Sequence, residues 1–320
     1  MCVSGRCVAP PDGGADGGCP GRLCLAGALS TPDPLRAVWG SGGASVFAVG
    51  ADGGVYHWDG GAWAFLPGSP TADLVDVWGN SDDDVWVASR SAVVHLGGGW
   101  QTWQVFPYSS GSTLPDVVVG IFSGVPNEAR MVATSNGGTA FFHCYSGSCI
   151  STLSDSRIAP RAMGGPPGQD GYWTVGMDRS AGSGALIRHP ASGVIDAYQA
   201  LGQGPLNGIA SDSAGAMMAV GAGGTVAVAA AGAASFTLEP SGPAVDLEQV
   251  AFVPGGGRAY AVAGNQILYR RAAPSTWEAF TPAGAAGAAL HDVFAASGGV
   301  LVVVGELDGG GIALVYSGAQ

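Results

Sequence analysis

Four histidines recur at comparable places along the chain and are the first candidates for metal or acid–base chemistry. One lies in HWDGGAW (57–63), and another lies in HLGGGW (95–100), an imperfect and shorter copy of that segment. A histidine can ligate a metal or transfer a proton near neutral pH. If this motif is one corner of a repeated unit, however, its copies are held apart and cannot converge on one metal, so we expect a recurring structural role. The four residues are His57, His95, His143 and His189.

The densest group of carboxylates is Asp82-Asp83-Asp84, within GNSDDDVW. Hard cations such as calcium take oxygen ligands of this kind, so calcium binding is left open, although aspartate is also a common turn former. No Ser–His–Asp triad can be proposed from spacing, because triads assemble by geometry and not by sequence order. We therefore assign no catalytic residue, no metal site and no cofactor from the sequence.

Six cysteines form three local pairs, each with four residues between its members. An even number in local pairs predicts disulfides formed in an oxidising compartment. A zinc site is the alternative, but it needs four converging ligands, and the third pair lies more than a hundred residues from the others. The last pair flanks YSGS at a predicted hairpin turn, where the flanking residues face each other, so we expect a bridge there. The pairs are Cys2/Cys7, Cys19/Cys24 and Cys144/Cys149.

Composition limits the kind of partner. The formal net charge is −12 and all twelve basic residues are arginines, which argues against a nucleic-acid partner because such a protein needs a basic stripe. The mean hydropathy of +0.28 suggests a membrane protein. The longest apolar stretch, Met217–Phe236, is nevertheless broken by glycines and built from small residues, so we expect no transmembrane segment. No signal peptide is visible at the start, and we expect a fragment or a truncated start.

An internal repeat organises these residues. Apolar runs that end in a small residue recur every 39 to 45 residues. A shorter Leu-x-x-Val or Leu-x-x-Ile segment precedes six of the seven runs, from Leu35/Val38 and Leu74/Val77 through Leu114/Val117 to the last three copies, and the fourth copy around 158–163 departs from it. The runs end at Gly50, Ser89, Thr134, Gly176, Gly221, Ala263 and Gly305.

Each copy reads as four short strands separated by turns rich in Gly and Asp. Seven such units of about 40 residues predict an all-β fold, a seven-bladed β-propeller of four-stranded antiparallel blades. The seventh copy ends after its third strand, so we expect residues 22–27 to complete it beside Ile312–Tyr316. The predicted domains are a Cys-rich N-terminal stub over 1–21 and the propeller over 22–320.

The segment LRAVWG…SVFAVGADGGVYHWDGGAW resembles the Val-Trp-Gly propeller repeats of secreted proteins and lipoproteins from high-GC soil bacteria. The match is good over residues 35–103 and continues as a pattern through 320. The turn at 59–63 is similar to a degenerate Asp-box of sialidase-like propellers, one residue short and with His57 in place of Ser. An Asp-box is a structural hairpin and implies no hydrolase. The resemblance implies export to the extracellular space or outer cell surface, and a binding role.

Two functions of different classes follow. The first is a monomeric interaction module that binds protein or glycan on one face of the propeller; the second is a propeller glycoside hydrolase or lyase with its site at the central channel mouth. Three or more Arg or His side chains meeting at one channel mouth would favour the enzyme, and a channel lined by Val, Ala and Gly would favour the module. The five glutamates form no sialidase-like constellation with Arg and Tyr. We therefore prefer the module.

Loop lengths suggest which face binds the partner. In a propeller, the loops from second to third strands and from each outer strand to the next blade share one face. The variable segments PYSSGST (107–113) and MDRSAGSG (177–184) belong to these two classes, and function concentrates in variable loops held by a rigid scaffold. We predict binding over blades two to four, with Tyr108, Asp178 and Arg179 as contacts. The alternative is that these loops are tolerated insertions.

Overall fold

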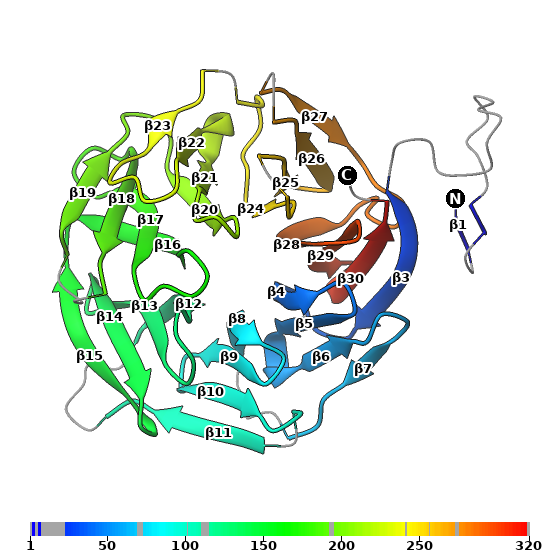
Figure 1. Ribbon diagram of the computed structural model, residues 1–320, viewed down its shortest axis with the longest axis horizontal. Helices are drawn as coiled ribbons and strands as arrows, with labels where there is room; N and C mark the ends of the chain where they lie inside the picture. The colour runs from blue at the N-terminus through cyan, green and yellow to red at the C-terminus, as the bar shows by residue number, and fades with distance from the viewer. Residues whose placement is uncertain are drawn as a thin grey trace.

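The computed structural model describes residues 2–3, 6–7, 23–68, 73–100, 102–109, 115–191, 195–240, 242–255, 257–272 and 275–318. In this part of the chain, seven four-stranded antiparallel sheets surround a central axis (Figure 1). The predicted seven-bladed β-propeller is therefore confirmed. The described residues contain two short helices, η1 (Ala51–Gly53) and η2 (Ala222–Gly224). Neither of these helices is long and apolar enough to cross a membrane.

The strands of the first four blades run from the innermost to the outermost in chain order. Blade 1 consists of β4 (Leu35–Gly42), β5 (Ser45–Gly50), β6 (Val55–Trp58) and β7 (Trp63–Phe65). Blade 2 consists of β8 (Leu74–Ser81), β9 (Asp84–Ser89), β10 (Ala92–Gly97) and β11 (Thr102–Pro107). Blade 3 consists of β12 (Val117–Phe122), β13 (Ala129–Ser135), β14 (Gly138–Tyr145) and β15 (Ser148–Asp155). Blade 4 consists of β16 (Ile158–Gly164), β17 (Tyr172–Asp178), β18 (Gly184–His189) and β19 (Ala197–Ala200).

The last three blades follow the same order, except that the outer strand of blade 7 comes from the start of the chain. Blade 5 consists of β20 (Leu206–Ser211), β21 (Met217–Gly221), β22 (Val226–Ala229) and β23 (Thr237–Leu238). Blade 6 consists of β24 (Gln249–Phe252), β25 (Ala259–Ala263), β26 (Gln266–Arg270) and β27 (Trp277–Phe280). Blade 7 consists of β28 (Ala289–Ala296), β29 (Val300–Leu307), β30 (Gly310–Ser317) and β3 (Cys24–Thr31).

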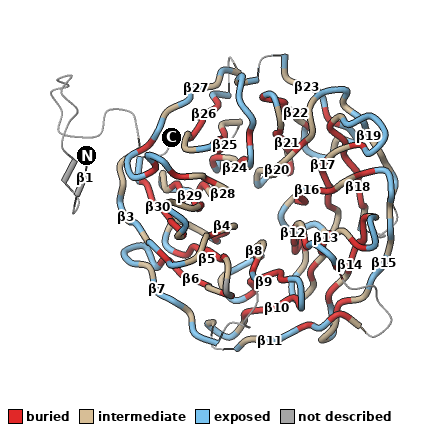
Figure 2. Tube along the Cα trace, turned by 180° about the vertical axis from the view of Figure 1, so that it is seen from behind, coloured by how far each residue is buried: buried red, intermediate tan, exposed pale blue. Residues whose placement is uncertain are grey.

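The second strands explain why the repeat is visible in the sequence. Every residue of β5 and β9 is buried, because both faces of a blade are covered by its neighbours. A strand covered on both faces has a continuous apolar run and no alternation. The outer strands are mostly exposed or half-buried, as the pale rim in Figure 2 shows. The propeller core therefore consists of layers between adjacent blades.

The ring closes between the two ends of the propeller, as predicted. Strand β3 pairs antiparallel with β30 from Cys24↔Ser317 to Thr31↔Gly311. The pairing extends four residues beyond the predicted limit of residue 27. Closure by strands from opposite ends of the chain removes the open edge that β30 would otherwise present.

The disulfide predictions have different outcomes. Cys144 and Cys149 form a disulfide with Cα atoms 4.0 Å apart, so this bridge is confirmed. Cys24 is also disulfide-bonded. The backbones of Cys2 and Cys7 pair directly between β1 (Cys2–Val3) and β2 (Arg6–Cys7), whereas their side chains and Cys19 lie outside the described residues. The domain boundary at residue 21 stays a prediction.

The alignment of the third copy differs from the sequence prediction, whereas the fourth copy departs from the pattern as predicted. In blade 3 the positions of the Leu-x-x-Val pattern are held by Val118 and Ile121, not by Leu114 and Val117, because the register shift on the inner strand falls between Val118 and Gly120. In blade 4 the leading position is Pro160, since the shift there falls between Pro160 and Ala162. The pattern was misplaced in blade 3 because VVVGIF allows several alignments, and blade 4 departs from it because a proline stands where the other copies have leucine or valine.

Candidate functional site

The inner strands of the propeller enclose a cavity of about 680 Å³ along the central channel. All seven blades contribute to its wall. A cavity of this size is within the range of ligand pockets in proteins. The channel is therefore the first place to look for a site.

A recurring β-bulge gives each blade one side chain at the channel. In six blades the pairing of the first two strands skips one residue near the start of the inner strand. In blade 6 the corresponding residue stands just before β24. Bulges re-aim side chains and are common beside functional sites. The seven residues, which we call the bulge ring, all line the cavity and are Arg36, Val75, Val119, Arg161, Asn207, Glu248 and His291.

The bulge ring lies on the face that the sequence analysis predicted for binding. Each ring residue stands in the first half of an inner strand or, in blade 6, just before it, at the end where the loop from the preceding outer strand enters. Its chemistry differs from blade to blade, with two arginines, one histidine, one glutamate, one asparagine and two valines. Arg36 makes a loose ion pair with Asp73 at 3.8 Å, and Arg161 donates to the side-chain oxygen of Asn207 at 2.5 Å.

Below the bulge ring, two aspartates lie in the channel wall at equivalent positions. Asp76 of blade 2 accepts the backbone N–H of Val77 at 2.9 Å and that of Ile121, in blade 3, at 2.8 Å. Asp292 of blade 7 makes the same pair of contacts, with Val293 and, in blade 1, Val38, both at 2.8 Å. Each carboxyl group therefore joins two adjacent blades at the channel edge, where inner strands have free N–H groups.

Desolvation changes the acidity of both carboxyl groups. Burial raises the pKa of Asp76 to about 7, although its two backbone donors act in the opposite direction. Burial, followed by repulsion from Asp76, raises the pKa of Asp292 to about 8, against the lowering by its own donors. Loss of water around a carboxylate disfavours the charged form. The channel wall therefore holds two carboxyl groups whose pKa values lie near or just above neutral pH.

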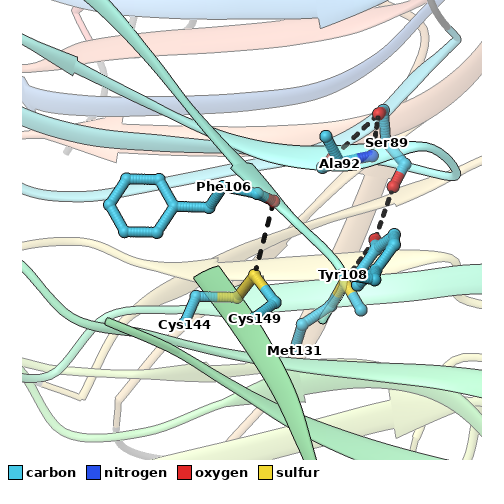
Figure 3. Close-up of a disulfide and its surroundings, with 7 residues drawn as sticks. All are labelled: Ser89, Ala92, Phe106, Tyr108, Met131, Cys144 and Cys149. Atoms are coloured by element: carbon cyan, nitrogen blue, oxygen red, sulfur yellow. Dashed lines mark hydrogen bonds between the residues drawn. A yellow bond between two sulfur atoms is a disulfide. The ribbon is translucent and has the colours of Figure 1, made fainter. Parts of the chain in front are cut away.

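Tyr108, a predicted contact, is buried instead of exposed. It follows β11 and has only 9% of its surface exposed, between blades 2 and 3. Its hydroxyl donates to the Ser89 carbonyl at 2.8 Å and lies 3.3 Å from the Met131 sulfur, beside the Cys144–Cys149 disulfide (Figure 3). Burial also raises the pKa of Tyr108. The side chain therefore joins two blades, and we do not retain it as a contact.

Asp178 is the last residue of β17 in blade 4, and Arg179 begins the loop to β18. Asp178 is buried, with 8% of its surface exposed, and its side chain accepts hydrogen bonds from the Ser180 backbone and hydroxyl and from Tyr198. These donors lower the pKa of Asp178. Arg179 is exposed and donates to the Ile158 carbonyl at 3.0 Å. Neither residue lines the channel cavity, and a role in binding stays a prediction for both.

The four histidines each bond within their own blade. His57, His95 and His143 hold equivalent register positions on the third strands and reach Ser45, Asp84 and Glu128 at 3.0, 2.7 and 2.7 Å. His189 is one register position later and lies 3.4 Å from the Thr174 hydroxyl. Burial lowers the pKa of His189 to about 3. These contacts fit the predicted structural role.

The three aspartates considered for calcium are used in different ways. Asp84 is buried and accepts hydrogen bonds from Trp86 and His95. Asp82 accepts one from Ser41, and Asp83 accepts one from the Gly99 backbone at 3.0 Å. Within the part of the chain that the structure describes, no three His, Cys, Asp or Glu side chains are grouped as a metal site would require.

Sequence reasoning missed Asp76, Asp292 and Arg161. The first two occupy the same variable position of the Leu-x-x-Val pattern, which is the signal that could have paired them. The lining of the channel does not by itself separate the enzyme from the module. Arg36, Arg161 and His291 all line the channel, but so do many valine, alanine and glycine residues.

No protein-family model matches the chain, and no curated protein matches its sequence. Solved structures with the same fold do match. The β-propeller domain of Cps50 (Swd1) from Myceliophteria thermophila aligns with 12% identity and a TM-score of 0.72, over 92% of this chain and 99% of that one. YCF48 bound to D1 peptide aligns with 16% identity and a TM-score of 0.68, over 91% and 94%. The WD40 β-propeller domain of Doa1 aligns with 10% identity and a TM-score of 0.69, over 92% and 97%.

Proposed function

We propose that this propeller is an interaction module that binds a peptide segment of a partner protein at the channel mouth. The observation that carries the proposal is the bulge ring. The blades repeat the same apolar scaffold, but the seven side chains at the same point of the channel are of five different types. A rigid scaffold with one variable position per repeat suits specific recognition. The propeller fold, shared with WD40 domains, is compatible with such a role.

The complex of YCF48 with D1 peptide supports the choice of a peptide, because that propeller holds one. For the present chain, carbohydrate binding, a monomeric state and a bacterial source stay predictions. We also propose that the chain acts outside the cytoplasm. The Cys144–Cys149 disulfide supports this, since disulfides persist in oxidising compartments.

The second candidate is a glycoside hydrolase or lyase that acts in the channel. The raised pKa values of Asp76 and Asp292 favour it, because a carboxyl group that keeps its proton near neutral pH can act as a general acid. Three basic side chains line the same cavity. The hydrogen bonds of these carboxyl groups argue against it. In each group one oxygen accepts an N–H of its own blade and the other accepts an N–H of the next blade, so both oxygens already have a structural role. We therefore place binding first.

Peptide selection tests the binding proposal. A displayed peptide library and a glycan array are screened with the purified chain, and the peptides recovered are tested against two sets of variants. Glu248→Arg and Arg36→Glu change the bulge ring, whereas Asp83→Asn changes an exposed residue on the opposite face. We expect the ring variants to lose the peptides and Asp83→Asn to keep them. Hydrolysis of chromogenic glycosides, or peptides lost only in Asp83→Asn, would contradict the proposal.

A further inference from the structure

Seven equivalent backbone N–H groups follow one another around the channel. They belong to the residues that come two positions after each bulge residue. In blade 2 this residue is Val77, which pairs with Val87 of the second strand, and the other blades have the same register. The seven residues are Val38, Val77, Ile121, Met163, Ile209, Val250 and Val293.

Side chains of the channel wall accept five of these N–H groups. Asp76 accepts those of blades 2 and 3, and Asp292 accepts those of blades 7 and 1. The side-chain oxygen of Gln249 accepts the N–H of Val250 at 3.0 Å. The pattern has a direction, because each aspartate serves its own blade and the next one along the chain. One carboxyl group at a junction therefore satisfies two N–H groups.

The N–H groups of Met163 and Ile209 have no such acceptor among the described residues. They belong to blades 4 and 5, which are related in the same way as blades 2 and 3. The position that is Asp76 in blade 2 and Asp292 in blade 7 is Ala162 in blade 4. The corresponding residues of blades 3 and 5 are Gly120 and Gly208, so none of these three positions has a side chain that could accept an N–H group. Met163 and Ile209 line the cavity, so an acceptor that enters the channel can pair with these two N–H groups.

A cation lies at the same junction. Arg161 is the bulge residue that directly precedes Ala162, it is exposed, and it lines the cavity together with Met163 and Ile209. Its guanidinium donates to the neutral side chain of Asn207. Among the described residues, it makes no ion pair with a carboxylate. The junction therefore offers two backbone donors and one uncompensated positive charge.

We propose that the junction between blades 4 and 5 binds a carboxylate, whose two oxygens accept the N–H groups of Met163 and Ile209 while Arg161 pairs with its charge. The inference rests on the proposed function and deepens it, because it defines the partner as a peptide that carries an acidic side chain or a free C-terminal carboxylate. The carboxylate occupies the place that Asp76 and Asp292 hold at the other two junctions. Hydrogen bonds between charged groups and backbone donors are among the strongest in proteins.

Backbone amide signals of the full chain in ¹H–¹⁵N spectra test the proposal directly. Three short peptides are titrated: acetyl-Ala-Ala-Gly-Ala as a free acid, the same peptide as a C-terminal amide, and the amide with an internal aspartate. We expect the Met163 and Ile209 signals to shift with one or both of the acids and not with the neutral amide. A shift with the free acid alone identifies a terminal carboxylate, and a shift with the aspartate peptide alone identifies a side chain. No shift of these two signals, or an equal shift with the neutral amide, would overturn the proposal.

Three variants complete the test. Ala162→Asp supplies the missing carboxylate from the chain itself and should abolish the shifts. Arg161→Gln should raise the peptide Kd by about tenfold or more, while Arg90→Gln, an exposed arginine on the same face and away from the cavity, should leave it unchanged. If Ala162→Asp does not fold, the comparison of Arg161→Gln with Arg90→Gln still decides. If selected peptides bind the bulge ring without moving the Met163 and Ile209 signals, this inference fails and the proposed function stands.

Discussion

The carboxyl group of Asp292 in blade 7 accepts the backbone N–H of Val38 in blade 1 at 2.8 Å, across 254 residues of sequence. The same two blades meet where the chain closes on itself, because β3 completes blade 7 before the chain enters blade 1. The propeller is thus closed twice, by a strand at its rim and by a side chain at its channel. Both closures can be tested separately.

Removal of the rim closure should destabilise the protein. Deleting residues 1–28 takes away most of β3 and exposes the edge of β30. We expect the melting temperature to fall by about 5 °C or more. A deletion of residues 1–22 leaves β3 intact and serves as the control. If the two deletions melt at the same temperature, the closing strand contributes nothing measurable.

The channel closure should give stability a characteristic dependence on pH. Asp76 and Asp292 have folded-state pKa values of about 7 and about 8, well above the unfolded value near ~3.9. The folded state therefore binds more protons, so their contribution is fully present below about pH 4 and is lost as pH rises through about 7 to 8. Between about pH 5 and pH 9, the wild type should lose at least ~1 kcal/mol relative to the Asp76→Asn/Asp292→Asn double variant. Urea unfolding of both proteins measures this difference, and parallel pH profiles would refute the assignment.

His189 should give the free energy of unfolding the opposite dependence on pH. Its folded-state pKa is about 3, below the unfolded value near ~6.5. The unfolded state therefore binds the extra proton, and the stability that neutral His189 contributes is lost as pH falls from about 6.5 towards 3. A His189→Gln variant should show a shallower loss of stability over this range. Equal slopes for variant and wild type would contradict a buried, neutral imidazole.

Loss of the disulfide should cost stability without changing the fold. The Cys144→Ser/Cys149→Ser double variant removes a cross-link over a short loop, which we expect to lower the free energy of unfolding by about 2 kcal/mol. The intact mass of the non-reduced wild type should show no free thiol at these positions. Two alkylated thiols there would show that the bridge is absent.

Tyr108 should affect stability and not recognition. Tyr108→Phe removes the hydrogen bond to the Ser89 carbonyl and leaves a buried acceptor, at a cost of about 1 kcal/mol. Binding of a selected peptide should be unchanged, whereas the original expectation from the sequence was a weaker complex on loss of this side chain. A stable Tyr108→Phe variant with reduced peptide affinity would restore Tyr108 as a contact.

The blades could be predicted from the sequence because their second strands are buried on both faces. That burial makes runs such as Val46–Gly50 continuously apolar, and their spacing then gives the number of blades. Blade 3 was misaligned because several registers place a β-branched residue at each position of Val117–Val119. The fourth inner strand departs from the pattern because Pro160 takes the place of leucine. In both cases the pairing of strands, and not the local pattern, decides the register.

The candidate site was beyond sequence reasoning for a different physical reason. Asp76 and Asp292 are single acidic residues in separate repeats, and only closure of the ring brings them to one channel. Met163 and Ile209 contribute backbone groups, which leave no signature in the side-chain sequence. The sequence suggested an exposed Tyr108 because this residue begins a polar loop, yet its ring is buried between blades 2 and 3. The repeat pattern of the sequence therefore predicts the strands of each blade but not the contacts between blades.

The central claim is that the bulge ring forms the binding face, and a map of amide shifts caused by a selected peptide tests it most directly. The account predicts that the shifted signals gather on the bulge ring, from Arg36 through Arg161 to His291, and on Met163 and Ile209 beneath it. Signals from Asp82 and Asp83, in the turn on the opposite face, should stay in place. A map centred on that turn, with the bulge ring unmoved, would contradict the claim.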